Sequence, residues 1–139
     1  MGRLFAASCG SYISSVNAVK INDGVNFCII DGGINNINYY GQMMGMKQPP
    51  LMHLPERAGE KRVYTVCGSL CTFQDVLLRK YETLPFEIGD LLVFGTIGAY
   101  SSTEGMNLFL SRDLPKILFK DKDGIKVVRD TFHTSSLNG

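Results

Sequence analysis

Two short segments of this 139-residue chain place reactive side chains among small residues. The first is Gly68-Ser69-Leu70-Cys71-Thr72, in which Cys71 lies between polar and small neighbours and not inside an apolar run. A thiol is mostly protonated at neutral pH, which suits a proton donor. The second is Gly98-Ala99-Tyr100, whose tyrosine follows an apolar run and could present its hydroxyl to a ligand. The plainer alternatives are a buried filler cysteine and a tyrosine packed on the core.

Gly2-Arg3 is a third segment whose residue types could bind a ligand, although the pair alone does not identify a function. Glycine permits close approach of a ligand to the backbone. Arginine offers a forked, charge-assisted set of donors that suits the oxygens of a phosphate group. The pair therefore becomes informative only together with other motifs.

Four motifs in the same order resemble the C-terminal domain of the fold-type III, pyridoxal-phosphate-dependent amino-acid decarboxylases, a family that includes the diaminopimelate and ornithine decarboxylases. The family pattern Gly-x-x-Cys-x-x-x-Asp is met by Gly68, Cys71 and Asp75, with an apolar run after it. Asp31-Gly32-Gly33 resembles a second signature, and Gly98-Ala99-Tyr100 resembles a third. The resemblance extends over nearly the whole chain.

Gly2-Arg3 resembles the end of a Glu-x-Gly-Arg motif found at the entry to this domain, so we expect the glutamate to precede Met1. The resemblance implies that Gly2, Arg3 and Tyr100 bind the phosphate of pyridoxal 5'-phosphate. It also implies that Cys71 is the catalytic acid, which protonates the substrate carbon after CO2 leaves and reaches the partner subunit's cofactor across a dimer interface.

Substrate-binding residues follow from the same resemblance and are predicted to be Tyr39, Tyr40, Thr72 and Asp75. Asp75 has a structural alternative, in which it closes its own turn. The diaminopimelate enzymes carry an Arg-Pro-x-x-Tyr run and a glutamate directly after the cysteine. This chain has residues 38–42 as Asn-Tyr-Tyr-Gly-Gln and has Thr72 after the cysteine, so diaminopimelate is not the expected substrate.

The resemblance also implies parts that lie outside this sequence. In the family, a lysine of an N-terminal (β/α)8 barrel holds the cofactor as a Schiff base, and residues 1–139 show none of the alternating strand–helix units of such a barrel. We therefore expect residues 1–139 to form a single C-terminal domain that is inactive alone. Its expected partners are the N-terminal domain of the same protein, a second subunit in a homodimer and a small amino-acid substrate.

Composition excludes several other functions. The net charge of +1 does not indicate the strongly basic surface that binds nucleic acid or an anionic membrane. The apolar runs all fall short of the roughly 18 residues that cross a bilayer, and a cytoplasmic location is expected. The four cysteines are expected to be reduced thiols, and no metal site is predicted because Cys67 and Cys71 have no second Cys/His pair at ligand spacing.

Short apolar runs separated by turn residues predict an all-β fold, mainly β with one or two short helices. The strands of this fold would position the reactive side chains described above. The resemblance makes this a Greek-key-like β-barrel, as in the C-terminal domain of alanine racemase and diaminopimelate decarboxylase-type enzymes. Residues 34–47 are the main helical candidate, and residues 73–81 fit either a helix or a strand. The segment after Arg3 looks strand-like. The tail from Thr131 is expected to fray. The expected strands are residues 12–21, 25–30, 62–67, 91–97, 116–119 and 125–128.

Two alternatives remain open at this point. A racemase or epimerase domain of the same fold type would carry a tyrosine base at the position of Cys71. A non-catalytic β-barrel dimerisation module would bury Cys71 and Tyr100 apart from each other, pointing in different directions. The decarboxylase interpretation predicts instead that both side chains flank one polar surface that faces the dimer partner.

Overall fold

The computed structural model describes residues 1–38 and 48–138, and β-strands dominate them, as the sequence predicts. Six strands form one sheet in the order β3-β6-β1-β2-β4-β5, and β7 pairs with β8 in a separate sheet of two strands. The elements are α1 (Gly2–Ala6), η1 (Ala7–Cys9), β1 (Tyr12–Asn22), β2 (Val25–Ile30), β3 (Leu51–Leu54), β4 (Arg62–Cys67), β5 (Val76–Thr83), β6 (Leu91–Phe94), η2 (Phe109–Ser111), β7 (Ile117–Asp121), β8 (Gly124–Arg129) and η3 (Thr134–Leu137).

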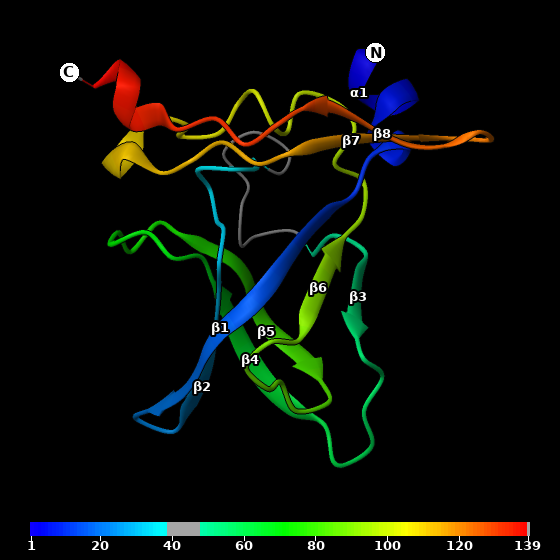
Figure 1. Ribbon diagram of the computed structural model, residues 1–139. Coiled ribbons are helices and arrows are strands. Elements are labelled where there is room, and N and C mark those ends of the chain that lie inside the picture. The colour runs from blue at the N-terminus through cyan, green and yellow to red at the C-terminus, as the bar shows by residue number, and fades with distance from the viewer. Residues whose placement is uncertain (39–47, 139) are drawn as a thin grey trace.

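The long strand β1 gives the larger sheet its curvature. Its first residues, 12–15, pair with β6, and the rest of the strand from Val16 onward pairs with β2. A register shift between Val16 and Ala18 marks a bulge at the changeover, and bulges bend a strand and increase its twist. The sheet therefore curls into a half-barrel (Figure 1).

Both predicted hairpins are confirmed. β1 and β2 meet at Asp23 and Gly24, which both have positive φ angles of 47° and 77°, as a tight two-residue hairpin turn requires. β7 and β8 are joined by a turn at Lys122 and Asp123, directly before Gly124, whose φ angle is 130°. An Asp-Gly pair lies at each connection, as the turn itself in the first hairpin and as the step from the turn into β8 in the second.

The hydrophobic core lies inside the curled sheet. The strands β1, β4 and β6 bury alternate residues, because successive side chains on a strand point to opposite faces. Tyr64 and Phe86 pack within this core with ring centroids 4.8 Å apart. The most buried apolar members are Val16, Cys28, Ile30, Ile37, Val66, Leu77, Leu78, Leu92 and Phe94.

Strand β5 departs from simple alternation because it carries two bulges. Tyr64 pairs with Tyr81 and Val66 pairs with Leu78, so two residues of β5 oppose one residue of β4; a second shift follows before Val76. As a result, the neighbours Leu77 and Leu78 are both buried, while the next two residues of β5 are both exposed. Residues 73–81, which fitted either helix or strand in the sequence, contain most of this strand.

The structure corrects the expectation for the segment after Arg3. It is helical in α1 and η1, and not a strand. Leu4 and Phe5 are 80% and 74% exposed, so no neighbouring strand pairs with this segment, and leucine and alanine favour a helix where no sheet partner is present. The strand expected over residues 91–97 ends at Phe94, and β3 was not predicted at all.

The tail also differs from its prediction, since it is anchored and not frayed. Leu114 and Phe132 form an isolated antiparallel bridge, and Thr134 is fully buried with its hydroxyl donating to the carbonyl of Arg112 at 2.9 Å. Asn138 donates a further hydrogen bond to the carbonyl of Leu108 at 3.3 Å. Of the helical candidate at residues 34–47, only residues 34–38 are described, and they form a turn.

The β7–β8 hairpin lies across one end of the curled sheet, the end that also holds α1 and both termini (Figure 1). Its strands expose apolar side chains in succession, including Leu118, Phe119, Ile125, Val127 and Val128. No helix in residues 1–38 and 48–138 combines the length and the apolar character that crossing a membrane requires.

Candidate functional site

Cys71 lies on the exposed loop between β4 and β5, as the sequence predicts. Asp75 holds this loop from beneath. Its side chain is 2% exposed, and its carboxylate accepts hydrogen bonds from the backbone N–H groups of Ile34 and Leu70, each at 2.9 Å. The N–H of Gly68 also donates to the carbonyl of Asp75 at 3.0 Å, which closes the base of the loop.

The environment of Asp75 is built around its carboxylate. A Cβ atom on Gly68 would lie 2.2 Å from one carboxylate oxygen, so this position must be glycine for the loop to pass the aspartate. Burial raises the pKa of Asp75, and the hydrogen bonds from Ile34 and Leu70, together with the charge of Arg112, oppose that rise. In this structure Asp75 therefore acts as a positioning residue for the Cys71 loop.

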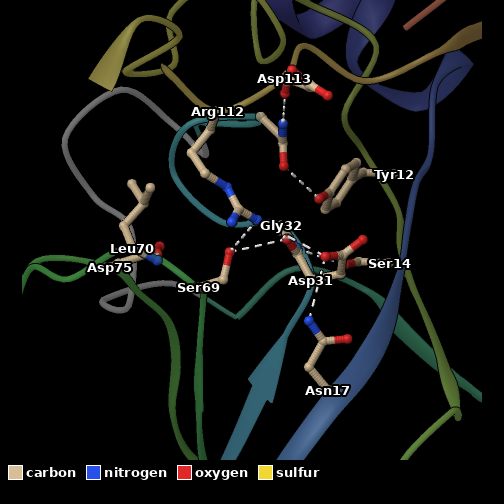
Figure 2. A network of polar contacts seen from close by, with 11 residues as sticks. Tyr12, Ser14, Asn17, Asp31, Gly32, Ser69, Leu70, Asp75, Arg112 and Asp113 are labelled. Atoms are coloured by element: carbon tan, nitrogen blue, oxygen red, sulfur yellow. Dashed lines mark hydrogen bonds and ion pairs between the residues drawn. The ribbon is translucent and has the colours of Figure 1, made fainter. Parts of the chain in front are cut away.

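A second set of contacts fixes the loop from the other side (Figure 2). Arg112 donates through Nη2 to the hydroxyl of Ser69 at 2.8 Å and to the carbonyl of Asp31 at 2.9 Å. The N–H of Ser69 donates to the carbonyl of Gly32 at 2.9 Å, and the hydroxyl of Ser69 donates to the carbonyl of Asp31 at 3.0 Å. Arg112 thus joins the end of β2, the Cys71 loop and the segment before β7.

Tyr12 extends the same network toward β7. Its hydroxyl donates to Oδ1 of Asn36 at 2.9 Å, and Nδ2 of Asn36 donates to the carbonyl of Asp113 at 3.4 Å. Burial raises the pKa of Tyr12 to about 12, so this hydroxyl stays protonated and keeps its role as a donor. The hydrogen bonds that join Tyr12, Asn36 and Asp113 therefore keep the same donors and acceptors at neutral pH.

The three predicted phosphate-binding residues lie together, although Gly2 and Tyr100 are 98 positions apart in the sequence. A Cβ atom on Gly2 would lie 2.3 Å from the hydroxyl oxygen of Tyr100, so only glycine allows this approach. The Arg3 guanidinium carbon lies 5.4 Å from the centre of the Tyr100 ring, which is within cation–π range. Arg3 also donates through Nη1 to the carbonyl of Ala99 at 3.1 Å.

Tyr100 is presented outward. It is 53% exposed and adopts a left-handed conformation with φ of 63°, which is strained for a residue with a bulky side chain. Its hydroxyl makes no hydrogen bond with another residue of the described chain. Strain of this kind persists where the surrounding structure imposes it, and here the carbonyl of Tyr100 accepts hydrogen bonds from the N–H groups of Thr103 and Glu104, each at 2.9 Å.

One groove of about 650 Å³ connects the Cys71 loop with the segment after Tyr100. Phe73 and Gln74 come from the loop, and Glu104, whose carboxylate lies 2.8 Å from Nη2 of Arg3, comes from the other side. Cys71 and Tyr100 are both exposed, so the burial that a dimerisation module would predict for them is not observed. The groove is lined by Ile34, Asn38, Phe73, Gln74, Arg79, Glu104 and Met106.

The remaining predicted substrate-binding residues are only partly described. Thr72 sits directly beside Cys71 and its hydroxyl accepts from the N–H of Gln74 at 3.3 Å, which shapes the loop. Tyr39 and Tyr40 lie outside the described residues. Glu104 and Arg112 were not singled out as functional, because their partners are 101 and 43 positions away and no local spacing signals such contacts.

The other cysteines differ from Cys71. Burial raises the pKa of Cys28 to about 12, and burial also raises the pKa of Cys67, so these thiols are poor nucleophiles. All four thiols are free, and Cys9 donates to the carbonyl of Ala6. Across residues 1–38 and 48–138, no three His, Cys, Asp or Glu side chains gather where they could hold a metal ion.

A polar cluster around Asp90 ties β3 to the turn before β6. His53 contacts one oxygen of the Asp90 carboxylate at 2.7 Å, Arg57 donates to both oxygens, and the N–H of Glu87 donates at 2.8 Å. Burial opposes ionisation of Asp90, but the hydrogen bonds from Arg57, Glu87 and His53 outweigh it and hold its pKa at about 2. This cluster braces the sheet and does not line the groove.

Comparison with known proteins places this site in a wider context. Residues 5–98 match the family described as pyridoxal-dependent decarboxylase, C-terminal sheet domain. The diaminopimelate decarboxylase of Buchnera aphidicola subsp. Baizongia pistaciae is 30% identical over 132 residues, which cover 88% of this chain and 32% of that protein. The diaminopimelate decarboxylase of Methanocaldococcus jannaschii is 26% identical over 135 residues, covering 93% of this chain and 28% of that protein.

The fold agrees with these sequence matches. The crystal structure of the M. jannaschii diaminopimelate decarboxylase in complex with L-lysine superimposes with a TM-score of 0.85 at 26% identity, covering 98% of this chain and 30% of that chain. The chain thus spans about a third of the length of the curated relatives it matches. The expected fold class is confirmed by this similarity.

Proposed function

The chain belongs to the family of pyridoxal-dependent decarboxylases, as their C-terminal sheet domain, and we propose that it supplies part of the active site of an amino-acid decarboxylase. In this proposal residues 1–139 form one domain that works with a (β/α)8 domain of the same protein and with a second subunit. The domain alone is inactive, because the lysine that holds the cofactor belongs to the (β/α)8 domain.

The single observation that carries the proposal is the convergence of Gly2, Arg3 and Tyr100. The absence of a side chain on Gly2 lets the Tyr100 hydroxyl approach the backbone, the hydroxyl is available to donate, and the guanidinium lies alongside the ring. A hydroxyl and a guanidinium are strong donors to phosphate oxygens, so the residues present fit the phosphate of pyridoxal 5'-phosphate. Binding this non-reacting group would fix the position of the reacting part of the cofactor.

The Arg3–Glu104 ion pair is compatible with that role. Glu104 holds the guanidinium through Nη2, while Ala99 holds it through Nη1, so the group is oriented before a ligand arrives. A guanidinium has five N–H donors, and these contacts leave several of them for phosphate. Preorganisation of this kind reduces the entropy that binding would otherwise cost.

When bound, pyridoxal phosphate supplies the electron sink that lets the α-carboxylate of an amino acid leave as CO2. We propose that Cys71 then gives its thiol proton to the substrate carbon. The loop contacts of Asp75, Ser69 and Arg112 fix the position of the thiol. Thr72, Tyr39 and Tyr40 would contact the substrate nearby.

The exposed apolar surface of the β7–β8 hairpin supports the proposed association with further parts of the protein. This two-stranded sheet carries successive large apolar side chains on both faces, and their exposure to water is unfavourable in free energy. Leu118, Phe119, Ile125 and Val128 are each more than half exposed. A neighbouring domain or subunit would bury them.

The proposal is tested with the full-length protein, loaded with pyridoxal phosphate and assayed for CO2 release from a panel of amino acids. Arg3→Gln and Tyr100→Phe should each weaken cofactor binding by about tenfold, as loss of a hydrogen bond to a charged group implies. Arg62→Gln, at an exposed arginine of β4, serves as the matched control and should leave binding unchanged. Absence of CO2 release from every amino acid by the loaded protein would contradict the proposal.

A further inference from the structure

Arg79 is the charged residue of the groove whose charge is not compensated. Two charged side chains line the groove, and Glu104 is already paired with Arg3 at 2.8 Å. Arg79 forms no ion pair with any residue of the described ranges. Residues 39–47, which lie outside those ranges, contain no aspartate or glutamate that could pair with it. Among the residues that the structure describes, the guanidinium of Arg79 therefore has no counter-charge in the groove.

The first bulge of β5 explains why this side chain faces the groove. Arg79 and Lys80 together oppose the single residue Thr65 of β4, because Tyr64 pairs with Tyr81 and Val66 with Leu78. Lys80 takes the left-handed conformation, with φ of 52°, that this extra residue imposes. Bulges occur beside functional sites, where they re-aim a side chain. Here the bulge places Arg79 in the groove lining while Lys80 does not line it.

The rest of the lining suits a ligand that has an apolar stem and an anionic end. Phe73 is 88% exposed and Met106 is 41% exposed, and both belong to the groove with the buried Ile34. Glu104 contributes little repulsion toward an anion because its carboxylate is neutralised by Arg3. An unpaired guanidinium, with a forked set of donors, matches the geometry of a carboxylate.

We propose that Arg79 is a specificity-determining residue that binds a carboxylate at the distal end of the substrate. The inference rests on the proposed function and adds that the substrate reaches into this groove, whose lining residues Phe73 and Gln74 come from the loop that carries Cys71. It names the substrate class as an amino acid with an acidic side chain, whose α-carboxylate is lost while its distal carboxylate stays on Arg79. The apolar stem of the substrate lies along Phe73 and Met106.

Two measurements on the full-length holoenzyme test this inference. The first is the binding of glutarate, a dicarboxylate without an amino group, followed by isothermal titration calorimetry. Arg79→Gln should weaken glutarate binding by about ten- to a hundredfold, as expected for a charge-assisted hydrogen bond pair, and Arg79→Lys should restore part of it. Lys80→Gln, in the same bulge but outside the groove, is the matched control and should bind glutarate normally.

The second measurement separates the carboxylate from the phosphate as the anion that Arg79 binds. Titration of the cofactor-free full-length protein with inorganic phosphate should be weakened by Arg3→Gln and unaffected by Arg79→Gln. The opposite result, with phosphate binding dependent on Arg79, would overturn the assignment to the substrate's distal carboxylate.

The failure of this inference is distinguishable from the failure of the proposed function. If the holoenzyme releases CO2 but prefers lysine or ornithine over 2-aminoadipate, and Arg79→Gln leaves both that preference and glutarate binding unchanged, the inference is overturned and the decarboxylase stands. If no amino acid is decarboxylated but glutarate binding still depends on Arg79, the decarboxylase proposal fails and recognition of a carboxylate by the groove stands.

Discussion

Replacement of Asp75 by alanine tests how the loop that carries Cys71 is held in place. The carboxylate accepts the N–H groups of Ile34 and Leu70, each at 2.9 Å, and it is 2% exposed. Asp75→Ala would leave both N–H groups buried without a partner. We therefore expect the variant to be less stable and its Cys71 loop to open.

The magnitude follows from these two bonds and from the burial of the charge. A buried donor left unpaired costs about 1–3 kcal/mol, so two cost about 2–6 kcal/mol. Burial raises the pKa of Asp75, so ionisation of the native carboxyl itself carries a penalty that the variant avoids. The expected net loss of unfolding free energy is about 2–4 kcal/mol at neutral pH.

The sign of the pH dependence adds a second check. A carboxyl whose folded pKa is raised contributes stability below its unfolded pKa of about 4 and loses that contribution as pH rises through the folded pKa. The loss caused by Asp75→Ala should therefore be larger near pH 4 than at pH 7.

Urea unfolding of the chain at both pH values measures the stability, and hydrogen exchange of the Ile34 and Leu70 N–H groups measures the opening of the loop. Glu82→Ala, at an exposed position of β5, is the matched control. A loss below about 1 kcal/mol, or a loss that grows with pH, would refute the role given to Asp75.

Three further outcomes follow from the same structure. Iodoacetamide should modify the exposed Cys71 long before Cys28, whose burial raises its pKa to about 12; mass spectrometry of digests checks this order, and equal rates would contradict it. Asp90→Asn should cost about 2 kcal/mol at pH 7, because it weakens the bonds from Arg57, and the cost should vanish as pH falls from about 4 through about 2, measured by thermal unfolding. Gly2→Ala should weaken binding of pyridoxal phosphate to the full-length protein about tenfold, by fluorescence titration, because the new methyl group displaces the hydroxyl above it.

The parts of the fold that the sequence predicts are those that short segments encode. The turn at Asp23-Gly24 and the loop bounded by Gly68-Ser69 are local, and both were placed correctly. Strand β3 was missed because it has four residues, follows Pro49-Pro50 and gains its identity only by pairing with β6. The helix α1 was missed because an apolar run without a sheet partner looks like a strand in isolation.

The residues of the site likewise divide into those that the sequence indicates and those that only the folded structure brings together. The motifs indicated Cys71 and Tyr100 individually, and the family resemblance grouped Gly2 and Arg3 with Tyr100, which the structure brings into contact. Residue types and spacing could not indicate Arg112, because its contact with Ser69 depends on how distant loops pack. Nor could they show that β5 carries bulges, because the bulges arise from pairing with β4.

The role of Cys71 as proton donor is the central claim, and replacement of this residue tests it most directly. Full-length Cys71→Ala, loaded with pyridoxal phosphate and supplied with its best amino-acid substrate, is compared with the wild type by measuring CO2 and the amine product in the same reaction. Cys9→Ala, also an exposed thiol but outside the loop, is the control. We expect amine formation by Cys71→Ala to fall by about a hundredfold or more, or to give way to a different product, as loss of a general acid implies. Unchanged turnover with an unchanged product would contradict the account.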